Sequence, residues 1–263
     1  MLFLRKPGGL ALFAGGSLAL AWGAIEKPPS GRQILMQMAN FLSKTPNWSV
    51  TVHTAYDTIQ RDGSKVEWNG VRMVTLSRPD RLRVESQRSD GARTLVVFNG
   101  QEITTFDESA KVYAQESHPG TVDDAVVYFV HDLGMRLPLA LLLLERLPAE
   151  LQQRVQGVEY VETAEALGAP ARHIVGKTST VDFQLWITVG DRPAPLRAVL
   201  TYKNVPGQPQ FRAQFTDWNF DSKPPDSLFT FTPAPGVKKI PFASALAKAG
   251  PRRGPAVRKG GAQ

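Results

Sequence analysis

The four histidines are the residues that most readily carry acid–base or metal chemistry in this chain, which has no cysteine. They stand far apart, at His53, His118, His131 and His173, and none has a second ligand at a metal-binding spacing. His53 and Asp57 share one face of an expected strand, but four residues along a strand span about 13 Å, so the two cannot pair directly. No phosphate-binding loop or nucleophile elbow is present. The sequence predicts a protein that is not an enzyme and needs no cofactor or metal.

The first residues have the pattern of a bacterial export signal. Arg5 and Lys6 precede an apolar run from Leu10 to Trp22, and small residues follow it. The run is shorter than the roughly 20 apolar residues that span a bilayer, so we expect residues 1–24 to be a cleaved signal peptide. An uncleaved membrane anchor is the alternative. Without cysteine there is neither a disulfide nor a lipid-modified residue, which predicts a periplasmic protein that is not a lipoprotein.

The net charge of +7 comes from the two ends of the chain. Arg5, Lys6 and five basic residues within residues 243–263 supply it, which leaves residues 25–242 with 24 basic and 24 acidic side chains. A nucleic-acid partner is therefore not expected. The tail, residues 243–263, is rich in Ala, Gly and Pro, and we expect it to be disordered. A weak, transient contact with anionic lipid or cell-wall polymer is the alternative role for its charges.

Strand periodicity dominates residues 25–242, which we expect to form a single domain. Trp48, Val50 and Val52 alternate with polar residues, and similar alternation returns in a series of segments up to Ser117 and again from Val155 to Phe220. Turn residues separate these segments, so neighbouring strands should pair as antiparallel hairpins. The pattern predicts a mainly β (α+β) fold. We expect a strongly curved antiparallel sheet of about ten strands, forming a half-barrel whose concave face is plugged by helices.

Helices are expected before the first strand and between the two series of strands. Ser30 can cap the first helix, whose apolar residues recur at helical spacing. A second helix should begin at Thr121 and close at Gly134. A third should begin at Pro138 and carry the run 139–144, which is apolar on every side and must be covered by protein or by a ligand.

Three segments resemble a known bacterial family. They are "LPLALLL", "VDFQLWITVGDRPAPLRAVLTYKNVPGQPQFRAQFTDWNF" and "PDSLFTFTPAPGVKKIPF". They are similar to a domain-of-unknown-function family of predicted periplasmic proteins, which is itself similar to the lipoprotein carrier LolA and its receptor LolB. The resemblance implies a half-barrel with a helical lid over an apolar concavity. Leu141 stands where that family commonly has an acid, and the absence of cysteine argues against a lipidated receptor like LolB.

The candidate site is an apolar cavity between the sheet and its helices. A lipid, an acyl chain or a lipoprotein would fill it, and the protein would act as a periplasmic binding or carrier protein. An envelope protein-interaction or stress-sensing module, in which the same residues are filled core, is the alternative. The residues expected to line the cavity are Trp68, Leu82, Val84, Leu95, Val97, Phe129, Leu139, Leu142, Leu143, Phe183, Leu185 and Trp186.

The aromatic residues near the end of the domain predict how the sheet closes. The alternation of Phe211 and Phe215 changes phase after Asp217, which predicts a bulge in the last long strand. Phe229 and Phe231 should lie on one face of a further short strand that closes one edge of the sheet.

Overall fold

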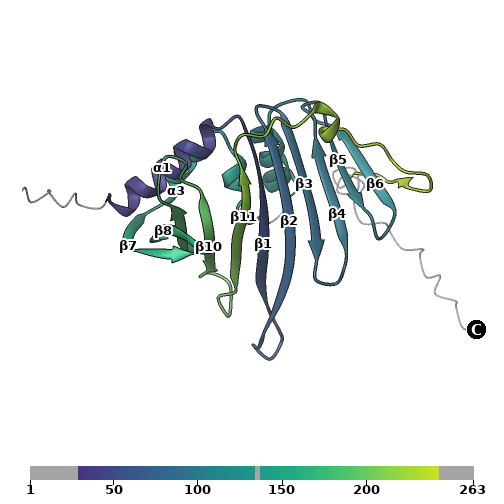
Figure 1. Cartoon of the computed structure of the whole chain (residues 1–263). Coiled ribbons are helices and arrows are strands. Elements are labelled where there is room, and N and C mark those ends of the chain that lie inside the picture. The colour runs from purple at the N-terminus through teal and green to yellow at the C-terminus, as the bar shows by residue number, and fades with distance from the viewer. Residues whose placement is uncertain (1–28, 134–136, 243–263) are drawn as a thin grey trace, which may run out of the picture.

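The structure, a computed structural model, describes residues 29–133 and 137–242 (Figure 1). The expected signal peptide, Gly134 and the basic tail lie outside these residues. The described part forms one sheet of twelve strands in the order β12-β6-β5-β4-β3-β2-β1-β11-β10-β9-β8-β7. The fold class is therefore confirmed as mainly β with a curled, largely antiparallel sheet.

The elements up to the sixth strand form one meander that follows a helix. Their bounds are α1 Gly31–Lys44, β1 Asn47–Ile59, β2 Lys65–Ser77, β3 Arg81–Arg88, β4 Arg93–Phe98, β5 Glu102–Asp107 and β6 Val112–Ser117. Figure 1 shows these strands side by side, with α1 displaced toward the far end of the sheet.

The second half adds short helices and a second meander. Its bounds are α2 Val122–Val127, η1 Tyr128–Asp132, η2 Ala140–Leu143, α3 Leu147–Arg154, β7 Gly157–Ala166, β8 Ala169–Lys177, β9 Val181–Thr188, β10 Pro195–Tyr202, β11 Gln210–Asn219, η3 Asp226–Phe229 and β12 Lys238–Lys239. β1 pairs with β11 and joins the two meanders, while β12 pairs with β6 in parallel.

The first helix forms as the sequence predicts. The Ser30 hydroxyl accepts a hydrogen bond from the Gln33 N–H, and the Gln33 side chain accepts one from the Ser30 N–H, which completes a capping box. α1 packs on β7 and β8. A Cβ at Gly31 would stand 2.6 Å from the carbonyl carbon of Glu159, so glycine permits this close approach. The apolar stripe that α1 buries consists of Ile34, Leu35, Met38, Ala39 and Leu42.

The expected leucine helix is wrong. Residues 140–143 form only the short 3₁₀ turn η2, Leu139 before it has a left-handed backbone with φ of 67°, and no side chain caps it. The next true helix, α3, begins at Leu147. The second expected helix is confirmed at its start, where Thr121 and Asp124 form a capping box, but it changes to the π-helical turn η1 after Val127. A run of leucines supplies no polar face and no cap, so the packing around it sets its backbone.

The bulge predicted in the last long strand is confirmed. The pairing of β1 with β11 shifts by one residue between Ser49 and Thr51, and Asp217 opposite this point has a φ of 56°. The strand expected at Phe229 and Phe231 is wrong, because residues 226–229 form the turn η3. Phe231 nevertheless packs near the edge of the sheet, with its ring 5.3 Å from those of Phe106 and Tyr113.

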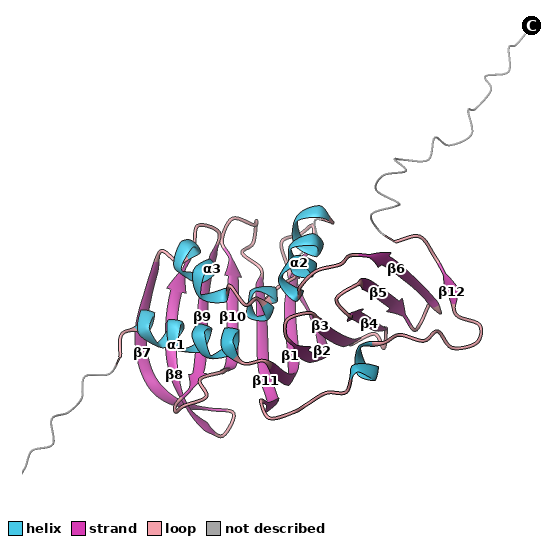
Figure 2. Cartoon of the chain, turned by 90° about the horizontal axis from the view of Figure 1, so that it is seen from above, coloured by secondary structure: helices cyan, strands magenta, loops and turns pink. Residues whose placement is uncertain are grey.

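The two faces of the sheet have different coverings. Paired residues in antiparallel strands point to the same face, so register assigns each side chain to a face. The concave face carries Trp48 and Leu76, which belong to one core with the buried residues of α1 and α2. The opposite, convex face carries Arg83, which donates to the Leu228 carbonyl of η3. Figure 2 shows α2 and η3 on opposite sides of the sheet.

Candidate functional site

The concave face of β1–β5 is organised in rows of paired side chains that run across the strands. We call the first the inner row, and its members are Trp48, Leu76, Leu82, Phe98 and Ile103. All five are buried in the core cluster. This end of the concave face is therefore filled by protein.

The next row along the strands is only partly covered. We call it the middle row, and it consists of Val50, Val74, Val84, Val96 and Thr105. Val50 is buried, but the three other valines are only half-buried and pack against the margin of the core. An apolar surface therefore begins here that the described protein does not fully cover.

Toward the β1–β2 hairpin the concave face becomes polar and then exposed. The outer row contains Val52, Arg72, Ser86 and Thr94. Thr54 and Gly70 follow, and then Tyr56 and Trp68, which are 37% and 38% exposed. The Trp68 indole N–H donates to the Thr58 hydroxyl at 3.1 Å, which fixes the ring at this rim. Along β2 the concave face thus passes from the buried Leu76 through the half-buried Val74 and Arg72 to the exposed Trp68.

The leucine run lies on the same side of the sheet. η2 contacts α1, α2 and α3, and residues 139–143 are all half-buried at the margin of the core. Its end is firmly held, because Leu144 is only 2% exposed and the Asp123 carboxylate accepts from the Glu145 N–H at 2.8 Å. The four leucines among residues 139–143 are therefore anchored at one end yet incompletely covered.

The structure brings nine of the twelve expected residues to the concave side. On β3 and β9, Leu82, Phe183 and Leu185 are buried, and Val84 is half-buried. Phe129 of η1 is buried in the same core. The others are the half-buried Leu139, Leu142 and Leu143 and the exposed rim residue Trp68.

Three expected residues lie on the convex face and do not line the concave surface. Leu95 and Val97 alternate with the concave Val96, so the pleat of β4 turns them outward. Trp186 alternates with Leu185 in the same way. It stacks on the His173 ring with centroids 4.1 Å apart, and the Arg197 guanidinium lies 4.8 Å from its centroid. The sequence alternation already separated Trp186 from Phe183 and Leu185.

Arg72 is the concave residue that the sequence analysis missed. Within the described part of the chain, its guanidinium has no hydrogen bond or ion pair. It interacts electrostatically with Tyr56. Burial lowers the pKa of Arg72 below its ordinary value, and Tyr56 opposes that effect. The available signal was its parity, because Arg72 shares the strand phase of Val74 and Leu76.

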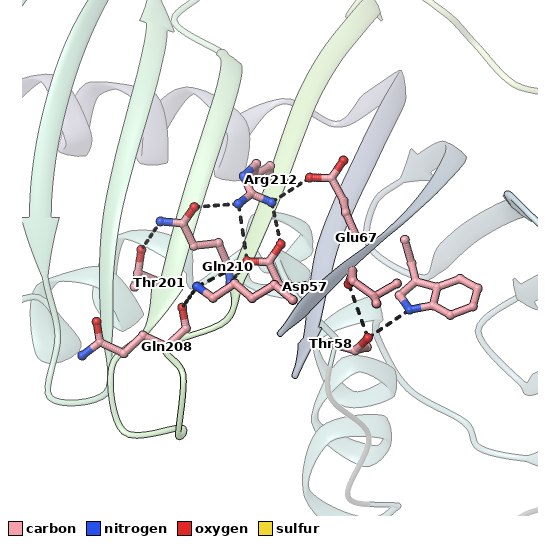
Figure 3. Close-up of polar contacts among 10 residues, drawn as sticks. Asp57, Thr58, Glu67, Thr201, Gln208, Gln210 and Arg212 are labelled. Carbon is pink, nitrogen blue, oxygen red and sulfur yellow. Dashed lines mark hydrogen bonds and ion pairs between the residues drawn. The ribbon is translucent and has the colours of Figure 1, made fainter. Parts of the chain in front are cut away.

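The convex face carries a polar network at the junction of the two meanders (Figure 3). The Asp57 side chain is only 4% exposed and accepts hydrogen bonds from the Arg212 guanidinium at 2.9 Å and the Gln210 N–H at 2.9 Å. Arg212 also donates to Glu67 at 2.9 Å. Burial raises the pKa of Asp57, but the bonds from Arg212 and Gln210 and the positive charges of Arg212 and Lys65 together hold it below its ordinary value of 3.8.

This network has the geometry of a structural clamp. Every oxygen of Asp57 faces a donor from β11, and the figure shows Arg212 placed between Asp57 and Glu67 (Figure 3). A carboxylate so fully engaged is a poor general base. Within residues 29–133 and 137–242, no group of three His, Asp or Glu side chains is placed to hold a metal ion.

Two open pockets lie beside α1 rather than over the middle row. One, of about 660 Å³, is lined by residues that include Asn40, Arg78 and Glu145. The other, of about 570 Å³, also reaches Asn40 and is lined by Arg172 and Asp191. None of the twelve expected residues lines either pocket. In the described residues, no helix is long and apolar enough to cross a membrane.

A family model described as "Predicted periplasmic protein (DUF2092)" matches residues 31–243. The chain belongs to this family. The expected resemblance and the expected periplasmic location are thereby confirmed for this DUF2092 protein. Among curated proteins, no sequence matches the chain.

Several solved structures match the chain at low sequence identity. MucB is 17% identical, with a TM-score of 0.41, and the match covers 77% of this DUF2092 chain and 62% of MucB. The chain therefore spans less than two thirds of that protein. The lipoprotein LppX from Mycobacterium tuberculosis is 12% identical over 73% of this chain and 96% of its own, with a TM-score of 0.41. The LolA superfamily protein NE2245 from Nitrosomonas europaea is 12% identical over 77% and 98%, with a TM-score of 0.36.

Proposed function

We propose that the protein is a periplasmic, non-catalytic binding or carrier protein that holds an acyl chain or another apolar ligand, a lipid or the lipid part of a lipoprotein, against its concave face. One observation carries this proposal. The four leucines among residues 139–143 are all only half-buried, although leucine side chains suit a fully buried core. Contiguous apolar surface of this kind is typical of binding sites.

The half-buried valines of the middle row supply a second wall for the ligand. They lie on the same side of the sheet as the leucine run and are likewise incompletely covered. Each methylene group that leaves water contributes about 0.8 kcal/mol, so a chain of eight methylenes gains about 6 kcal/mol before the cost of association. Burial of the chain therefore supplies a driving force for binding that requires no polar contact.

The test is binding of an uncharged acyl probe to the purified protein. We expect the methyl ester of pyrene-labelled dodecanoic acid to bind the wild-type protein, and Leu142→Gln to weaken this binding at least tenfold while the fold is retained. The matched control is Leu167→Gln, because Leu167 is an exposed leucine in the β7–β8 hairpin. The affinity of the Leu167→Gln variant for the ester should equal that of the wild-type protein.

Two outcomes would contradict the carrier proposal. One is a folded wild-type protein that binds no ester. The other is a Leu142→Gln variant that unfolds, as a variant of the buried Leu144 should, because the leucine run would then be ordinary core.

A second candidate function is an interaction module that captures an envelope protein. It is favoured by β7, a ten-residue strand at the edge of the sheet with Val161 exposed on it. Such an edge can accept a strand from a partner. A protein that is folded, binds no apolar probe and recognises an extended peptide would support this function instead.

A further inference from the structure

We infer that the ligand is an anionic amphiphile, and that Arg72 receives its carboxylate or phosphate head while the acyl chain lies along the middle row. This inference rests on the proposed function and adds the chemical class of the ligand. Neutral lipids, among them esters and glycerides, offer no charge to Arg72. They would be weaker ligands.

The position of Arg72 carries the first step. Its neighbours across the concave face are Val52 and Ser86, and Val74 lies two residues along β2 on the same face. In the register, Arg72 therefore stands between the valines of the middle row and the exposed rim at Tyr56 and Trp68. Since residues two apart on a strand are separated by about 7 Å, a head group at Arg72 places the start of its chain over Val74 and Val84.

The second step is that the described residues offer Arg72 no counter-charge. Arginine has five N–H donors and is almost always paired when it is withdrawn from water. The acidic residues on this face are remote or engaged: Asp107 is three strands away and accepts from the Ala110 N–H, and the Glu116 carboxylate bonds the Tyr128 hydroxyl. The described residues thus leave a partly desolvated cation facing an apolar surface without a counter-charge.

The exposed rim beyond Arg72 carries the third step. Gly70 is the next concave residue toward the rim, and a Cβ there would stand 2.9 Å from the Gln87 carbonyl oxygen, so glycine permits close packing of β2 against β3 at this point. Tyr56 and Trp68 then form a rim that is more than a third exposed. In this proposal the head group approaches Arg72 from the exposed rim. Arg88, the nearest other cation on this face, is already paired with Asp90.

The experiment compares three pyrene-labelled probes with the same chain: a dodecanoic acid, its methyl ester and a dodecyl phosphate. We expect the wild-type protein to bind the two anions at least tenfold more tightly than the ester, because a charge-assisted pair favours them. Arg72→Met should abolish this preference and leave ester binding unchanged. Arg72→Lys should keep part of it. The two anions separate carboxylate from phosphate recognition, since a bidentate fit to one of them will give the larger ratio.

Arg93→Met is the matched control, because Arg93 is an exposed arginine on the opposite face of the same sheet. It should keep the full preference for anions. A wild-type protein that binds the ester as tightly as the acid, or an Arg72→Met variant that keeps the preference, overturns the inference and leaves the carrier function standing. A folded protein that binds none of the three probes overturns both.

Discussion

Two segments that carry large apolar side chains, α1 and the leucine run, meet the sheet in opposite ways. α1 alternates its apolar stripe with polar residues, has a capping box and buries its stripe almost completely against β7 and β8. The leucine run has no polar face, begins at a left-handed Leu139 and leaves residues 139–143 half-exposed. Burial at the two sites is therefore decided by amphipathic spacing and by caps, and total hydrophobicity does not predict it.

The same contrast extends to the two halves of the sheet. Over β8–β11 the concave residues Ile174, Ile187, Ala198 and Ala213 are almost fully buried. Over β2–β4 the valines of the middle row remain only half-buried, and they border Arg72, which has no hydrogen bond or ion pair among the described residues. The concave face of one half of the curved sheet is covered as in a conventional core. The concave face of the other half is only partly covered by the described protein, as we expect for a binding surface.

The strongest test of this contrast is a pair of leucine truncations. Leu42→Ala in α1 should lower the free energy of unfolding by about 2–5 kcal/mol, because it leaves a cavity in a closed core. Leu142→Ala should cost less than half as much, because its side chain is partly in water already. Urea denaturation of both variants measures the difference. Equal losses would show that the two segments are equivalent parts of one core.

A second test addresses the clamp that joins the halves. At pH 7, Asp57→Asn should lower the free energy of unfolding by about 1–2 kcal/mol, since it removes the charge that Arg212 and the Gln210 N–H bind. The pKa of Asp57 is lower in the folded state than its ordinary 3.8. The stabilisation is therefore present above 3.8 and is lost as the pH falls through the lower, folded-state pKa.

The readout for Asp57 is the difference in stability between variant and wild type as a function of pH. This difference in the free energy of unfolding should be constant from pH 7 to about pH 5. It should disappear only as the pH falls below 3.8. Asp182→Asn is the control, because Asp182 pairs with Lys203 on an exposed surface and should contribute at most about 0.5 kcal/mol. If the Asp57→Asn variant is still less stable than the wild-type protein at pH 2, the electrostatic account is contradicted.

The smallest expected effects come from removing the N-terminal caps of α1 and α2. Ser30→Ala should cost about 1 kcal/mol of global stability, because α1 is part of the closed half. Thr121→Ala removes the same kind of cap from the six-residue α2, and we expect it to increase local amide hydrogen exchange near α2 more than it lowers global stability. If both variants lose the same global stability, α2 belongs to the same cooperative unit as α1.

The sequence predicts regular elements well and irregular ones poorly, for a physical reason. Alternation located the ends of the two series of strands within a few residues, and the phase change after Asp217 located the bulge. The leucine run and the segment at Phe229 lack a fixed period, because prolines and packing determine their backbones. Alternation along the strand already separated Trp186 from Leu185 and grouped Arg72 with Val74. The pairing register, which no single segment encodes, decided that Leu95 and Val97 face outward.

The order of strands in the sheet also has a consequence for the kinetics of folding. Most neighbours are consecutive hairpins that can form from local contacts, but β1 must find β11 across most of the chain, as in the pairing of Thr54 with Ala213. Closing so long a loop is slow, so we expect each meander to assemble first and this seam to close last. Until then β1 and β11 are long free edges, and at high concentration two chains can exchange them. Refolding in dilute solution should therefore give the highest yield of monomer.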